Sequence, residues 1–156
     1  MVIKNTSILF LFFLMLGSSI ASAQCERLSN KRIYQLLGAA EYDNARISEI
    51  KTSDNIVKEE YQIDLFKGVV YKLVFDVSKM PEGVVINLHD IGNKRGVNKY
   101  ELVFSSETAE KTKDDTYEVT LEFPQKKLMV SYDIINDTKS GCVAFVLGFY
   151  FKNRIR

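Results

Sequence analysis

The sequence has no tryptophan, only one histidine and two cysteines, and few residues that break regular structure. Two prolines and eight glycines in 156 residues are too few for a collagen-like or low-complexity chain, and 46% hydrophobic residues exclude a disordered one. No charge of one sign dominates, because 21 basic side chains nearly balance 20 acidic ones. We therefore expect no nucleic-acid partner, since proteins that bind nucleic acid by charge carry a clear excess of basic residues.

The scarcity of histidine also argues against an enzyme. His89 is the only histidine, so any serine–histidine triad depends on it, and no G-x-S-x-G turn occurs. Glu118 and Glu122 share one face of a predicted strand, but four residues at about 3.4 Å each separate their Cα atoms by roughly 13–14 Å, beyond the carboxyl separations of glycosidases. We expect no catalytic residues. Three functions are considered: a binding or interaction module, a carbohydrate-binding module and a small hydrolase that uses His89. The hydrolase has the least support.

Metal ligands are equally sparse. Two cysteines and one histidine do not complete a four-ligand zinc site without carboxylates. Residues 90–98 and 113–115 contain oxygen ligands suited to calcium, but neither segment has the order of a calcium-binding loop and both contain basic residues. We expect no metal site and no cofactor.

An apolar run near the N-terminus predicts export. Lys4 precedes the run at residues 8–16, and Ala21, Ser22 and Ala23 are small residues of the kind that signal peptidase accepts. At about 1.5 Å per residue, the run covers roughly 13 Å, which is too short for a hydrocarbon core of ~30 Å. We therefore expect residues 1–23 to be a cleaved signal peptide, no transmembrane helix in the mature chain, and a periplasmic or extracellular location.

The two cysteines lie at opposite ends of the mature chain. An oxidising compartment favours their pairing, and we predict a Cys25–Cys142 disulfide that joins the N-terminal segment to the last strand. The alternative, a reactive thiol, requires an environment that lowers the thiol pKa.

Alternating apolar and polar residues dominate the chain from Tyr61 onward. The clearest alternation covers residues 117–123, whereas residues 142–151 are almost wholly apolar and indicate a central strand buried on both faces. Seven such runs with short turns predict an all-β fold, an antiparallel β-sandwich of jelly-roll or immunoglobulin-like type. Residues 26–37 lack the alternation, and a short N-terminal helix is predicted there, with Ser29 or Asn30 as its cap and Gly38 at its end. We expect residues 24–57 to form this helix and a linker packed on the domain, with a short strand near Ile47 at most, and residues 58–156 to form the sandwich.

Two sets of residues are candidates for binding. Five tyrosines fall in phase with apolar neighbours and are expected in the core: Tyr61, Tyr71, Tyr100, Tyr117 and Tyr132. Tyr34, Tyr42 and Tyr150 are not in phase with apolar neighbours, and they are candidate aromatic residues for binding a carbohydrate ligand. Apolar residues out of phase with their strands are candidates for a partner-facing sheet surface: Phe66, Val74, Val85 and Val103, with Met129 and Ile135. If several share an outer face, then the N-terminal segment, a second subunit or a partner must cover it.

Four segments of the chain resemble a known family. They are YQIDLFKGVVYKLVFDV, VVINLHDIGNK, TYEVTLEF and SGCVAFVLGF, which resemble small exported β-sandwich proteins of the Bacteroidetes, themselves similar to the bacterial pre-peptidase C-terminal domain. The resemblance implies an accessory, non-catalytic jelly-roll-like domain and transfers no catalytic residue. We therefore expect an exported binding or interaction module of the cell envelope, with an envelope protein or a polysaccharide as partner, and a carbohydrate-binding module as the alternative.

Overall fold

The computed structural model describes residues 25–51, 58–92, 100–122, 126–135 and 140–151. Within them the chain forms one helix followed by eight strands. They are α2 (Asn30–Leu37), β1 (Glu41–Ile50), β2 (Glu59–Leu65), β3 (Val69–Asp76), β4 (Val84–Asp90), β5 (Glu101–Ser105), β6 (Thr116–Glu122), β7 (Lys126–Ile134) and β8 (Gly141–Phe151).

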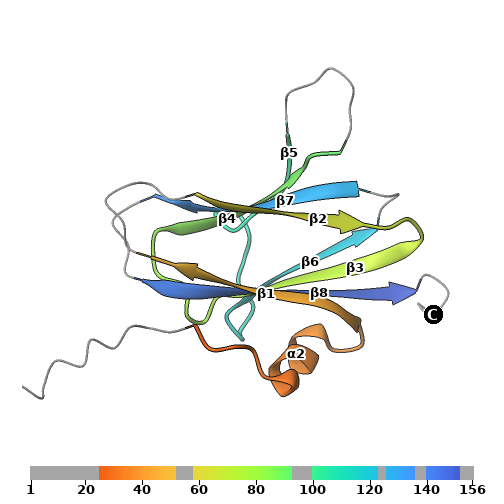
Figure 1. Ribbon diagram of the computed structural model, residues 1–156, viewed down its shortest axis with the longest axis horizontal. Coiled ribbons are helices and arrows are strands. Elements are labelled where there is room, and N and C mark those ends of the chain that lie inside the picture. Colours follow the sequence, from red (N-terminus) through yellow and green to blue (C-terminus); the bar gives the residue numbers. More distant parts are fainter. Residues whose placement is uncertain (1–24, 52–57, 93–99, 123–125, 136–139, 152–156) are drawn as a thin grey trace, which may run out of the picture.

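The strands form two four-stranded sheets that lie face to face as two layers (Figure 1). Sheet A has the order β1-β8-β3-β6 and sheet B the order β2-β7-β4-β5, and every neighbouring pair is antiparallel. The predicted all-β sandwich is confirmed. Two four-stranded sheets in this order are those of a jelly roll, which decides between the two expected types.

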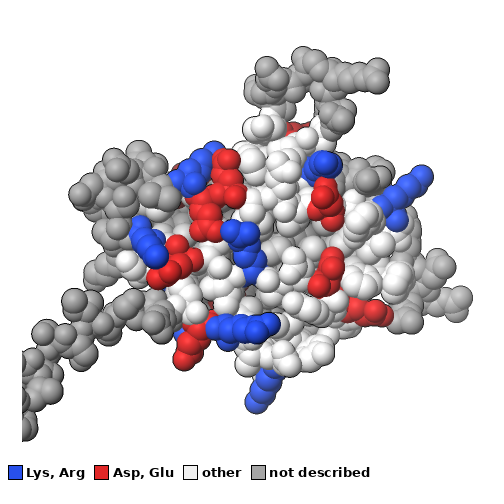
Figure 2. All heavy atoms as spheres, viewed as in Figure 1, with Lys and Arg blue, Asp and Glu red and all other residues white. Residues whose placement is uncertain are grey.

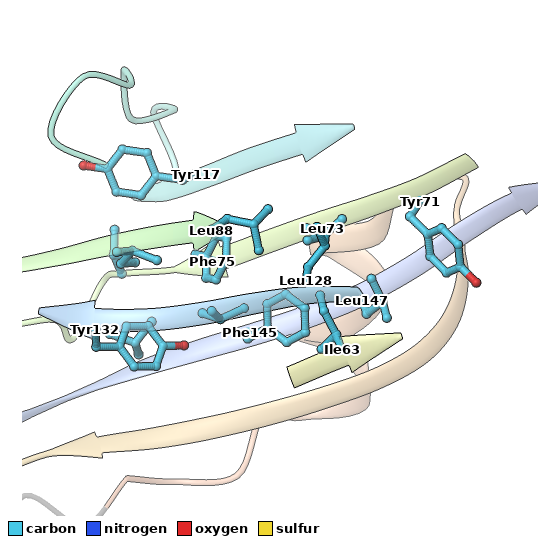
Figure 3. Packing of buried hydrophobic residues seen from close by; sticks show 14 of the residues in the cluster. Ile63, Tyr71, Leu73, Phe75, Leu88, Tyr117, Leu128, Tyr132, Phe145 and Leu147 are labelled. Carbon is cyan, nitrogen blue, oxygen red and sulfur yellow. The ribbon is translucent and has the colours of Figure 1, made fainter. Parts of the chain in front are cut away.

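The core lies between the sheets. Alternate residues of each strand point inward, and the aromatic rings of Phe75 and Phe145 meet there with centroids 5.2 Å apart (Figure 3). The predicted alternation of β6 is confirmed, because Tyr117 and Leu121 are buried while Glu118 and Glu122 are exposed. The last strand is central and its residues 141–148 are buried, as its apolar sequence predicts.

A polar cluster links the two sheets where β1 lies near β2. The Arg46 guanidinium is 4.5 Å from the centre of the Tyr61 ring and 3.1 Å from a Glu59 carboxylate oxygen. Ser48 donates a hydrogen bond to the same Glu59 oxygen at 2.9 Å, and the hydroxyl groups of Tyr61 and Tyr132 are 3.1 Å apart. Burial, the largest influence on this phenol, raises the pKa of Tyr132 to about 12. The cluster joins the sheets with satisfied polar groups.

The structure differs from the expected domain boundary at residue 58. Residues 41–50, expected to be mostly linker, form β1, which pairs with β8 along its whole length. The sequence pattern does not reveal β1, because this strand lies at the edge of sheet A and its first four residues are exposed. The sandwich therefore begins at Glu41.

Candidate ligand-binding groove

The N-terminal segment covers the outer face of sheet A. Figure 1 shows α2 on the side of sheet A that faces away from sheet B. Cys25 forms the predicted disulfide with Cys142 of β8, which fixes the start of the segment on the sheet. Ser29 caps α2 by accepting a hydrogen bond from the backbone N–H of Arg32 at 3.2 Å, and Gly38 ends the helix with a φ of 62°. The sequence predicted Gly38 as the end of the helix and offered Ser29 as one of two possible caps.

A second apolar cluster holds α2 against the sheet. Leu37 is fully buried over Val74 of β3 and Val146 of β8, and Leu36 and Ala40 complete the cluster. Gly148 of β8 allows this close approach. A Cβ atom at that position would lie 2.6 Å from Leu37 Cδ2 and 2.9 Å from the Glu41 carbonyl oxygen.

A partly buried ion pair also fixes α2. Nη2 of Arg32 is 2.7 Å from Oδ2 of Asp76, whose side chain is buried at the end of β3. Burial alone would raise the pKa of Asp76, but hydrogen bonds from Ser78 and Arg32 outweigh it and hold the pKa below its usual value of 3.8. The carboxylate is therefore charged in the folded protein, and it contributes to the attachment of α2.

The stability that Asp76 contributes is expected to be lost in acid. Because its pKa is lower in the folded than in the unfolded protein, the contribution is complete well above pH 3.8 and declines as the pH falls through the folded-state pKa. Asp76→Asn should flatten this part of the stability profile in urea unfolding between pH 6 and pH 2. Asp64→Asn, which changes an exposed carboxylate on β2, should keep the wild-type profile. An unchanged acid slope in Asp76→Asn would contradict the assignment.

A groove of about 710 Å³ lies between the N-terminal segment and β1. Tyr34 of α2 and Tyr42 of β1 line it, and their side chains are 65% and 47% exposed. The other lining residues are Arg27, Leu28, Ser29, Asn30, Ile33, Ala45 and Ile47. The groove thus combines two accessible aromatic rings and an apolar lining with an amide, a hydroxyl and a guanidinium group, a mixture typical of ligand sites. We call it the Tyr34–Tyr42 groove.

A smaller groove of about 290 Å³ adjoins the same segment. Arg27, Leu28, Ser29 and Ile47 line both grooves. The smaller groove also contains the Arg32–Asp76 pair and the Lys79–Glu26 pair, whose closest N–O distance is 3.7 Å. Four of its five charged residues are therefore paired within the protein, and the fifth is Arg27, which lines both grooves.

The structure brings together two of the three candidate ligand tyrosines. Tyr34 and Tyr42 line one groove, whereas Tyr150 of β8 is half-buried beside the apolar cluster under α2. Sequence reasoning missed Arg27, Ser29 and Asn30 as lining residues. Their polar side chains precede or begin the predicted helix, but nothing in the local pattern indicates that β1 passes beside them.

The four residues expected on a partner-facing surface do not share one. Phe66 is exposed after β2, Val74 lies under α2, and Val85 is half-buried on β4. Val103 packs against the core, contrary to its predicted outward direction. The N-terminal segment was one of three groups expected to cover an outer sheet face, and it covers Val74.

A bulge in β5 explains the reversal at Val103. Leu88 pairs with Phe104 but the next residue, His89, pairs with Leu102, so Val103 is an extra residue between them. The insertion turns Leu102 to the outside, where it is 55% exposed. Tyr100, expected in the core, is also exposed, whereas the other four tyrosines predicted there are buried or half-buried.

The outer face of sheet B contains two buried polar atoms that lack partners. Among the residues that the structure describes, Nδ1 of His89 and Oγ of Ser131 make no hydrogen bond. His89 is half-buried, with its ring 6.5 Å from that of Tyr100, instead of the surface histidine that the sequence suggested.

The structure also shows the surroundings of the remaining residues that were considered for catalysis or metal binding. Glu118 pairs with Lys72 at 3.0 Å. Within the described ranges, no group of three or more His, Cys, Asp or Glu side chains is arranged to hold a metal ion. Of the two segments considered for calcium, residues 93–98 lie outside the described residues.

No helix in the described part of the chain has the length and apolar character needed to cross a membrane.

Comparisons with known proteins give a structural likeness to solved structures. No family model and no curated protein matches the sequence. The fold is similar to the crystal structure of PliG from Aeromonas hydrophila, a periplasmic lysozyme inhibitor of g-type lysozyme, with a TM-score of 0.46 and 9% identity. The match covers 72% of this chain and 89% of that one.

Proposed function

We propose that this protein is an exported, non-catalytic binding module of the cell envelope, and that the Tyr34–Tyr42 groove binds a carbohydrate chain. The pair of exposed tyrosines in the larger groove carries the proposal. Aromatic rings offer flat apolar surfaces to the C–H faces of sugars, while Asn30, Ser29 and Arg27 supply hydrogen-bonding groups for hydroxyls.

The disulfide and the N-terminal sequence support export. Disulfides persist in oxidising compartments, and Cys25 is the second residue after the predicted signal peptide. A periplasmic or extracellular location places the groove where polysaccharides occur. The predicted relation to the pre-peptidase C-terminal domain remains a hypothesis that agrees with a non-catalytic role.

The groove is a better candidate than the sheet surface expected from the sequence. Phe66, Val74, Val85 and Val103 lie in four different surroundings, so no single partner contacts them all. Tyr34 and Tyr42 come from separate elements and converge on one groove, whose position the disulfide and α2 fix. A preorganised site of this kind loses little conformational entropy when its ligand binds.

Substitution of either groove tyrosine is expected to weaken carbohydrate binding about tenfold. A tenfold loss corresponds to about 1.4 kcal/mol, which lies between the cost of an average contact residue and that of a central aromatic one. The affinities of the oxidised protein and of Tyr34→Ala and Tyr42→Ala can be measured by calorimetry against a panel of envelope and plant polysaccharides.

Tyr100→Ala is the matched control, because Tyr100 is 60% exposed but does not line the groove. It should bind as the wild type does. Equal losses in all three variants, or no binding to any polysaccharide in the panel, would contradict the proposal.

A further inference from the structure

Among the residues that the structure describes, the lining of the Tyr34–Tyr42 groove contains a basic side chain and no acidic one. Of its nine lining residues, Arg27 is basic and none is acidic. Figure 2 shows basic and acidic side chains intermingled on the face that it displays, without an extended area of one sign. The formal net charge of the chain is +1, so the basic residue in the groove is not part of a large general positive charge.

Two fixed points hold Arg27 at the groove. The Cys25–Cys142 disulfide lies two residues before it, and Ser29, the cap of α2, lies two residues after it. Leu28 between them packs against the apolar cluster under α2. The guanidinium therefore extends from an anchored backbone, and a contact with a ligand costs less conformational entropy than it would from a free terminus.

The smaller groove provides an internal comparison. It also contains basic residues, but Arg32 pairs with Asp76 and Lys79 pairs with Glu26. Acidic side chains of the protein pair with these two cations, whereas none of the described residues that line the Tyr34–Tyr42 groove is acidic. Arg27 lines both grooves, but a ligand in the smaller groove also faces Glu26 and Asp76, so a ligand that carries negative charge complements the Tyr34–Tyr42 groove better.

We propose that the ligand of the Tyr34–Tyr42 groove is an acidic polysaccharide, one that contains uronic acid residues. The tyrosine rings stack against the sugar rings, and the Arg27 guanidinium binds a sugar carboxylate, for which its planar pair of N–H donors is suited. Asn30 contributes amide donors and an acceptor for neighbouring hydroxyls. This assignment rests on the proposed function and adds the ligand class to it.

The test compares acidic chains with their neutral counterparts. The probes are oligogalacturonate, oligomannuronate and unsulfated chondroitin oligosaccharides, each also in a carboxyl-reduced form, measured by calorimetry with the oxidised protein. At least one acidic chain should bind about tenfold more tightly than its reduced form at low salt, and the difference should shrink in 0.5 M NaCl because salt screens the exposed contact.

Three variants separate this inference from the proposed function. Arg27→Ala should lose the preference for the acidic form, whereas Lys31→Ala, which removes an exposed charge that does not line the groove, should keep it. Tyr34→Ala should weaken acidic and reduced chains alike. Equal binding of both forms with intact dependence on the tyrosines would overturn the charge assignment and leave carbohydrate binding in place. No binding of either form would overturn both.

Discussion

Replacement of both Cys25 and Cys142 with serine is expected to lower the free energy of unfolding by about 4–5 kcal/mol. The two residues are separated by 117 positions, and a cross-link that closes so long a loop restricts the unfolded chain strongly in the chain-entropy model. Total stabilities of single domains are about 5–15 kcal/mol, so this loss is a large share. Urea unfolding of the wild type and the double variant, both without reductant, gives the difference directly.

The wild type in the presence of a dithiol reductant is the control for this experiment. Once reduced, it should unfold at the same urea concentration as the double variant. A double variant as stable as the oxidised wild type would contradict the prediction. Hydrogen exchange should also locate the change, because residues 26–29 lose their fixed point on β8 and their amides should exchange faster than those of the central strands.

Truncation of Phe75 is expected to cost about 3–5 kcal/mol of stability. Its ring is fully buried, lies 5.8 Å from that of Phe104 in a stacked arrangement, and also contacts Phe145 (Figure 3). Because Phe104 belongs to sheet B and the other two rings to sheet A, Phe75→Ala leaves a cavity between the sheets. Thermal unfolding should show a midpoint lower by about 10–20 °C.

Phe66→Ala provides the comparison at an exposed position. Phe66 is 61% exposed after β2, so its truncation should change the stability by no more than about 0.5 kcal/mol. A similar loss in both variants would mean that burial does not determine the effect.

The elements predicted correctly are those whose signal is local. Residues 117–122 alternate cleanly because β6 has one buried and one exposed face, and β8 is apolar throughout because other residues cover both of its faces. Ser29 and Gly38 mark the ends of α2 through hydrogen bonding and backbone conformation that single residues determine.

The elements predicted poorly depend on distant parts of the chain. β1 has an irregular pattern because it is an edge strand and α2 covers part of its outer side. In β5, one inserted residue at Val103 exchanges the inward and outward sides, so the alternation assigned Tyr100 and Leu102 to the core. The exposure of Tyr34 and Tyr42 was predictable, but their convergence required knowledge of how α2 lies beside β1.

The position of β8 determines when the protein is able to fold during its synthesis. The ribosome delivers β1 and β3 first, yet in the described residues these strands do not pair with each other but with β8, which lies between them in sheet A. Until residues 141–151 emerge, β1 has no neighbour in its sheet and Cys25 has no cysteine to pair with. Sheet A therefore stays incomplete until translation is nearly finished, because its last strand is the one that joins β1 to β3 and carries the cysteine that pairs with Cys25.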